Sequence, residues 1–222
     1  MLTEKDGGSG FRPGDLAPAL IKNSFTKSPE GWCSYDYHAS VVSGGVNVFI
    51  LATWAKGGGV KNGNFIWTSH TRWSAATPEK PLSILPLLFY RSWINSDPAD
   101  LRECEISFFL RGDELRLNGA NCYFWVHAGD TRWHCIAYPL KISMGGWASE
   151  PERLVLRDDE TLWNRSWALD PRSALPLTQA LRNVLSYGFS FTGFSGEVSG
   201  RLALAEFAVF PPRTAASSEK EV

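Results

Sequence analysis

The sequence lacks the segments that would direct a chain to a membrane or a nucleic acid. Its start, MLTEKDGGSGFRPGD, has no apolar signal-peptide core, and no later run reaches the roughly 20 apolar residues of a membrane span. An excess of one charge is missing too, because 22 Lys and Arg stand against 23 Asp and Glu, a net charge of -1. We therefore expect no nucleic-acid partner, no membrane partner and a cytoplasmic location.

Several catalytic and metal-binding motifs are also absent. Cys33, Cys104, Cys122 and Cys135 show no CxxC spacing, so we expect buried free thiols in place of a zinc ribbon or a redox site. No GK[ST] follows the glycine-rich residues 56–64, and the chain contains no GxSxG elbow. No cofactor is predicted. Structural calcium, which loop carbonyls bind without a sequence signature, stays open.

Helical periodicity is scarce. Residues 175–185, LPLTQALRNVL, are the best helix candidate, with Pro176 in the first turn. The rest consists of short apolar or alternating runs with turn signals about every eight to twelve residues. This pattern predicts an all-β protein, an antiparallel β-sandwich of jelly-roll type with at most one or two short helices. One domain is expected over residues 11–212, between disordered tails at 1–10 and 213–222.

Aromatic side chains are abundant, with 10 Trp, 13 Phe and 6 Tyr, and residues 121–138 concentrate them. This stretch, NCYFWVHAGDTRWHCIAY, predicts a β-hairpin, because two runs of β-forming residues flank a short polar loop that contains glycine. Pairing His127 with Arg132 across the loop sets the register. Trp125 then lies opposite His134.

Alternation along this hairpin separates two faces. The face predicted to pack in the core carries Cys122, Phe124, Val126, Trp133, Cys135 and Ala137. The other face carries Tyr123, Trp125, His127, Arg132, His134 and Tyr138. Because a core rarely holds so many polar side chains around one tryptophan, the second face is the predicted working surface. On this register Phe124→Ala should destabilise the fold, whereas Trp125→Ala should leave its stability nearly unchanged.

A flat aromatic ring on a strand, flanked by hydrogen-bonding side chains, suits a saccharide or a similar small molecule. We therefore predict a carbohydrate-binding, lectin-like face. Its predicted ligand-binding residues are Trp125, Trp67, His70, Arg72, Tyr90, Glu105 and Tyr138. The alternative is an enzyme, a lyase or isomerase with a His or Tyr base and an Arg that stabilises developing charge. Its predicted catalytic residues are His127, His134, Tyr123 and Arg132.

Two further interpretations stay open. His127 and His134 could join Glu105 in a metal-binding set, but the diagonal placement of the two histidines is awkward and no metal is predicted. A protein-interaction domain, in which the outer face meets another protein, is the other interpretation. The tripeptide Arg-Gly-Asp at residues 111–113 is expected to be a turn without a role of its own.

Part of the chain resembles known sugar-binding domains. The strands ISFFLRGD and LNGANCYFWV, and the ending SYGFSFTGFSGEVSGRLALAEFAVF, are similar to strands of carbohydrate-binding modules and of concanavalin-like lectin and glucanase jelly rolls. In those domains an acidic residue often stands where Glu206 stands here. The resemblance implies a β-sandwich with a carbohydrate ligand. A paired-Glu strand of the ExDxE kind is absent. Hydrolysis by two carboxylates is disfavoured because Glu105 has no obvious acidic neighbour.

Overall fold

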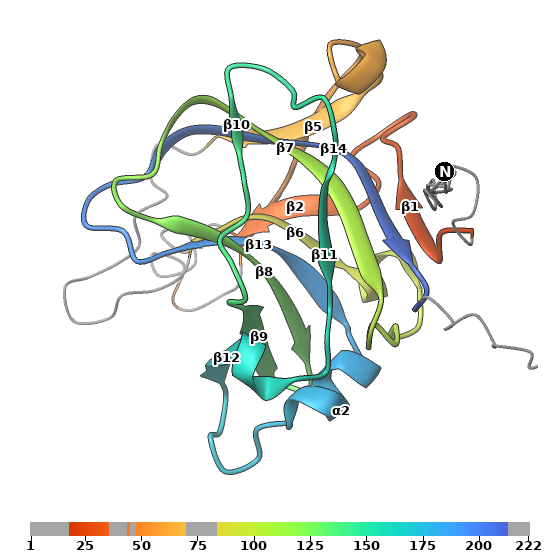
Figure 1. Ribbon diagram of the computed structural model, residues 1–222, viewed down its shortest axis with the longest axis vertical. Helices are drawn as coiled ribbons and strands as arrows, with labels where there is room; N and C mark the ends of the chain where they lie inside the picture. Colours follow the sequence, from red (N-terminus) through yellow and green to blue (C-terminus); the bar gives the residue numbers. More distant parts are fainter. Residues whose placement is uncertain (1–17, 36–43, 45–47, 70–83, 213–222) are drawn as a thin grey trace, which may run out of the picture.

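The computed structural model describes residues 18–35, 44, 48–69 and 84–212, and they form two stacked β-sheets (Figure 1). This arrangement confirms the predicted fold class, an all-β, largely antiparallel sandwich of jelly-roll type. The tails predicted at 1–10 and 213–222 lie outside the described residues. So do His70 and Arg72.

Sheet A contains seven strands, in the order β10-β7-β14-β5-β4, with β1 beside β14 and β11 beside β7. Their bounds are β1 Ile21–Asn23, β4 Thr53–Ala55, β5 Phe65–Ser69, β7 Glu105–Arg116, β10 Ser143–Met144, β11 Glu152–Val155 and β14 Ser199–Phe210. The pairing of β10 with β7 is parallel, and the other pairs are antiparallel. The tripeptide at 111–113 lies inside β7 and not in a turn, because β14 and β10 pair with it on both sides.

Sheet B also contains seven strands, in the order β12-β9-β8-β13-β6-β2-β3, and all of its pairs are antiparallel. Their bounds are β2 Trp32–Tyr35, β3 Phe49–Leu51, β6 Ile84–Tyr90, β8 Asn121–Ala128, β9 Thr131–Cys135, β12 Trp163–Ala168 and β13 Ser186–Thr192. Strands β8, β13 and β6 lie at its centre, although β13 follows β8 by more than fifty residues.

Helical structure is limited to short segments. The α-helix α2, Leu177–Arg182, lies within the predicted range 175–185 and buries Leu177, Ala180 and Leu181. Single 3-10 turns occur at η1 Val60–Asn62, η2 Arg91–Ile94 and η3 Glu160–Leu162. No described helix is long and apolar enough to cross a membrane.

The hairpin forms as β8 and β9 with the predicted register. His127 pairs with Arg132, and Trp125 pairs with His134. The predicted inner positions Cys122, Phe124, Val126, Trp133 and Cys135 all lie in the main core between the sheets. Ala137 is an exception. It is exposed because β9 ends at Cys135, after which the Ile136 amide donates to the Leu162 carbonyl.

All four cysteines are buried and free, as predicted. Cys104, Cys122 and Cys135 belong to the main core, whereas Cys33 packs on the outer side of sheet B. Burial raises the pKa of Cys33 to about 12 and that of Cys104 to about 11, so both thiols stay protonated at neutral pH.

A bulge bends the two longest strands where β7 meets β14. Glu114 and Gly200 both have positive φ, 52° and 98°, and the register shifts between Ser199 and Arg201. A Cβ on Gly200 would lie 2.4 Å from the Glu114 carbonyl oxygen. Glycine is therefore required here by its backbone conformation and by the close approach of β7.

Gly200→Ala should lower the free energy of unfolding by about 3 kcal/mol, through backbone strain and this clash. The matched control is Gly145→Ala, which has a φ of 74° but no atom within 4 Å of the added Cβ. It should cost about 1 kcal/mol, from strain alone. Urea denaturation of both variants measures the difference. Equal losses would show that the contact with β7 is not tight.

Candidate functional site

A row of five side chains crosses the outer side of sheet B, the side that faces away from sheet A. Trp167 pairs with Arg132, Arg132 with His127, His127 with Ser186, and Ser186 with Tyr90. Each pair joins neighbouring strands, from β12 through β9, β8 and β13 to β6, so the side chains stand beside one another. We refer to these five residues as the polar-aromatic row.

Arg132 is the charged member of this row. Its guanidinium carbon lies 5.1 Å from the Trp125 ring centroid and 5.7 Å from that of Trp167, so two indoles hold it by cation–π contact. The Nε atom is buried and has no hydrogen-bond partner among the described residues. Burial lowers the pKa of Arg132, which nevertheless stays charged at neutral pH because arginine titrates far above it.

The two histidines beside Arg132 are neutral. Burial first, and the Arg132 charge second, lower the pKa of His127 to about 4 and that of His134 to about 3. Nδ1 of His127 lies 3.4 Å from Ser186 Oγ, and Nδ1 of His134 lies 2.5 Å from Ser166 Oγ. At neutral pH both rings therefore act as uncharged hydrogen-bonding groups.

Trp125 lies on the predicted side of the sheet but is not exposed. Only 1% of its surface is accessible, and its Nε1 donates to the Phe189 carbonyl at 3.2 Å. It packs with Cys33, Leu85 and Leu88 in a second apolar cluster on the outer side of sheet B. The expectation that Trp125 could be removed without loss of stability is therefore wrong, because this face has a core of its own. His134 is equally buried, at 2% exposure.

Aromatic side chains extend the row beyond Tyr90. The Tyr90 ring lies 4.9 Å from that of Trp93 and 5.3 Å from that of Phe49, and Phe49 lies 5.3 Å from Tyr35. Trp93 keeps 45% of its surface exposed at this end, and Trp167 keeps 40% at the other. Burial is the main cause that raises the pKa of Tyr90, so its hydroxyl is protonated at neutral pH.

The structure brings together Tyr123, Trp125, His127, Arg132, His134 and Tyr90 on this side of sheet B. Trp67 and Glu105 lie on strands of sheet A, where Glu105 pairs with Arg153 at 2.5 Å. The Tyr138 hydroxyl donates to the Arg153 carbonyl in β11 of sheet A. Trp67, Glu105 and Tyr138 are therefore not part of the row. The predicted residues His70 and Arg72 fall outside the described ranges.

Trp167 and Ser186 belong to the row but were not predicted from the sequence. Simple alternation would place Trp167 on the same side as Trp163, which is buried in the core. A bulge between Arg165 and Trp167 reverses this and sets Trp167 beside Arg132. Ser186 joins the row through β13, which pairs with β8 and β6, two strands that are distant in sequence. Neither effect leaves a local sequence signal.

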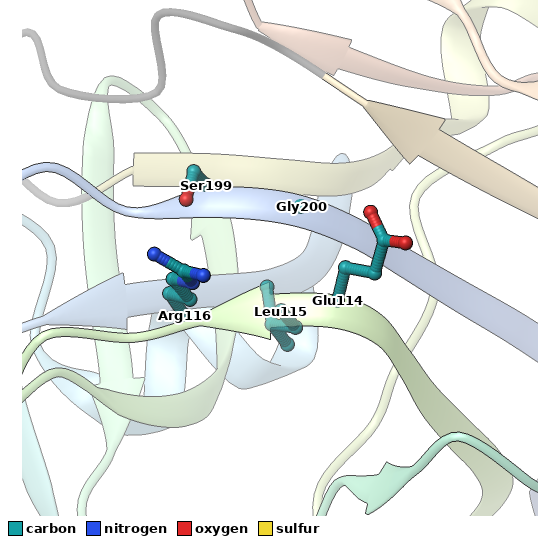
Figure 2. A pocket seen from close by; sticks show the side chains of 5 residues that line it. All are labelled: Glu114, Leu115, Arg116, Ser199 and Gly200. Carbon is teal, nitrogen blue, oxygen red and sulfur yellow. The ribbon is translucent and has the colours of Figure 1, made fainter.

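A separate depression lies at the bulge of sheet A (Figure 2). Its volume is about 580 Å³, and its lining consists of Glu114, Leu115, Arg116, Ser199 and Gly200. In the close view the Glu114 and Arg116 side chains lie apart, on either side of Leu115. They do not converge on one point, so this depression lacks the arrangement expected of a specific polar site. An isolated glycine in a strand pattern, Gly200, is the sequence signal that marks it.

The part of the chain that the structure describes contains no cluster of metal-binding side chains. There, no group of three His, Cys, Asp or Glu side chains is close enough to hold an ion. His127 and His134 share a face, but Glu105 lies in sheet A, so the three side chains considered together from the sequence do not meet.

No protein-family model matches the sequence, and no curated protein matches it. Among solved structures, an exo-β-agarase matches with 8% identity and a TM-score of 0.49, over 90% of this chain and 26% of that one. The chain thus spans about a quarter of the agarase's length. The family 11 carbohydrate-binding module of the cellulosomal cellulase Lic26A-Cel5E of Clostridium thermocellum matches with 14% identity and a TM-score of 0.39, over 72% of this chain and 81% of that one.

Proposed function

We propose that this protein binds saccharides on the outer side of sheet B, along the polar-aromatic row. The observation that carries the proposal is the exposed indole of Trp167 at the end of a line of hydrogen-bonding side chains on paired strands. A flat ring of this kind stacks against the apolar face of a sugar. His127 and Tyr90, which are half-buried, would then bind ring hydroxyls, while Ser186 is fully buried between them as a hydrogen-bond partner of His127.

The dimensions of the row favour an oligosaccharide. It crosses five strands, and adjacent strands lie about 4.8 Å apart, so its length is roughly 19 Å. Trp167 and Trp93, both partly exposed, stand at opposite ends. Because the strands are hydrogen-bonded to one another, these side chains are held in position before a ligand arrives.

The protonation of the histidines supports binding over acid–base catalysis. A general base is most effective with a pKa near the working pH, and His127 and His134 have pKa values of about 4 and about 3. They would be weak bases at pH 7. As a neutral ring, however, half-buried His127 is a suitable donor and acceptor for sugar hydroxyls, whereas His134, at 2% exposure, is too buried to reach them.

Trp167→Ala should weaken saccharide binding by about ten- to a hundredfold, because it removes the exposed stacking ring. A thermal-shift screen of mono- and oligosaccharides first identifies a ligand of the wild-type protein. Isothermal titration then compares the affinities of wild type and variant, and NMR of the recovered ligand tests whether it is unchanged. A chemically altered ligand would point to the lyase or isomerase alternative.

Trp147→Ala is the matched control. Trp147 also stacks on an arginine, with its ring centroid 4.5 Å from Arg111 Cζ, but it belongs to the cluster on the outer side of sheet A. This variant should bind as the wild type does. Equal loss of binding in both variants, or no loss in Trp167→Ala, would contradict the assignment to sheet B.

A further inference from the structure

Arg132 and Arg111 both have a buried Nε atom, but among the described residues only Arg111 has a carboxylate partner. The four arginine–carboxylate ion pairs among the described residues involve Arg102, Arg111, Arg153 and Arg172. Arg132 forms none of them. Its contacts there are the faces of Trp125 and Trp167. Burying a guanidinium without a counter-charge is unfavourable, so a site of this kind is incomplete without an anion.

Arg111 provides a comparison within the same chain. It too lies between two aromatic rings, with Cζ 4.8 Å from the Phe65 centroid and 4.5 Å from that of Trp147, and its Nε is also buried without a partner. Arg111, however, pairs with Asp113 at 3.0 Å and donates to the Gly58 carbonyl at 3.4 Å. On sheet A the protein thus supplies a carboxylate to the stacked arginine, whereas on sheet B none of the described residues does so.

The local chain at Arg132 does not provide an equivalent of Asp113. Alternate residues of a strand share a face, which is how Asp113 reaches Arg111 within β7. The residue two positions before Arg132 is Asp130, which is exposed in the hairpin turn with a φ of 56°. Two positions after it stands the neutral His134. The polar-aromatic row therefore carries a single positive charge among uncharged hydrogen-bonding groups.

From this arrangement we infer that the saccharide bound on sheet B is acidic, with a uronate carboxylate that pairs with the Arg132 guanidinium. A carboxylate matches the planar fork of arginine and accepts two parallel hydrogen bonds. Trp167, stacked on Arg132, contacts the same sugar ring that carries the carboxylate. This inference rests on the proposed saccharide binding and adds the chemical class of the ligand.

The experiment compares oligouronides with their methyl esters, which keep the linkage and stacking faces but lose the charge. Oligomers of galacturonate, glucuronate and mannuronate, each with its ester, are titrated into the purified protein by calorimetry. At least one acid should bind about tenfold or more tightly than its ester. Binding of an ester, or of a neutral oligosaccharide, as tight as that of every acid would overturn the inference and leave the proposed function standing. Failure of every saccharide to bind would overturn both.

Arg132→Gln should abolish the preference for the acid, so that the variant binds the oligouronide no more tightly than its methyl ester. Arg132→Lys, which keeps the charge but not the fork, should retain part of the preference. Arg111→Gln is the control on sheet A. It should bind the saccharide as the wild type does, because in the wild type Arg111 already pairs with Asp113 and is not available to a ligand carboxylate. Thermal unfolding confirms that each variant is folded. An acid preference that survives in folded Arg132→Gln would refute the role of this residue.

Discussion

Trp125→Ala should lower the free energy of unfolding by about 3–5 kcal/mol, as large-to-small changes in a core do. The indole is 1% exposed, packs with Leu85 and Leu88, and lies under the Arg132 guanidinium. Its loss would leave a cavity on the outer side of sheet B and remove the hydrogen bond to the Phe189 carbonyl. Urea denaturation with a fixed m-value measures the effect.

Two further variants provide comparisons for the stability loss expected of Trp125→Ala. Phe124→Ala, one residue earlier and fully buried on the inner side of the same strand, should cost a similar amount, about 3–5 kcal/mol. Trp167→Ala should cost less than about 1 kcal/mol, because its ring is already 40% exposed. If Trp125→Ala were as stable as the wild type while Phe124→Ala unfolded readily, the second apolar cluster would contribute nothing to stability.

Stability should fall by about 4 kcal/mol between pH 8 and pH 5, because His127 and His134 are neutral in the fold. Their pKa values, about 4 and about 3, lie below the 6.5 of an unfolded histidine, so the unfolded chain binds more protons as the pH falls. The stabilisation is complete above pH 6.5 and is lost as the pH falls towards the folded values. At pH 5 each histidine accounts for about 2 kcal/mol of the loss.

Denaturant unfolding at a series of pH values tests this dependence, with His127→Asn and His134→Asn as matched variants. Asparagine retains a group that can bind Ser186 or Ser166, but it does not titrate. Each variant should remove about half of the slope between pH 8 and pH 5, and the double variant nearly all of it. The exposed carboxylates whose pKa is lowered by neighbouring groups, Asp100, Asp159 and Asp170, act at lower pH. An unchanged slope in the double variant would rule the histidines out as its source.

The hairpin shows how much local sequence determines. Its register depends on a short glycine-containing loop and on strict alternation, so the predicted pairing of His127 with Arg132 is confirmed. The inward positions of Phe124 and Val126 follow from the same alternation. The helix within residues 175–185 was predictable too, because apolar spacing is a local property.

The composition of the candidate site depended on contacts between distant strands. Trp67 and Glu105 have the residue types expected of a ligand site, but β5 and β7 pair with β14 in sheet A and carry them away from the hairpin. Tyr90 joins the row because β13 lies between β8 and β6. Sheet membership is set by pairing between segments far apart in the chain, which no local pattern encodes.

By itself, then, the sequence determined the all-β class, the hairpin register, the burial of the four thiols and the side of the strand on which Arg132 and Trp125 lie. The tertiary structure decided that this side is partly a core and that a bulge in β12 brings Trp167 onto Arg132. It also decided that Arg111 pairs with a carboxylate, whereas Arg132 pairs with none among the described residues. The reason is physical. Alternation follows from the geometry of one strand, whereas burial, pKa and charge pairing depend on what the rest of the chain places against it.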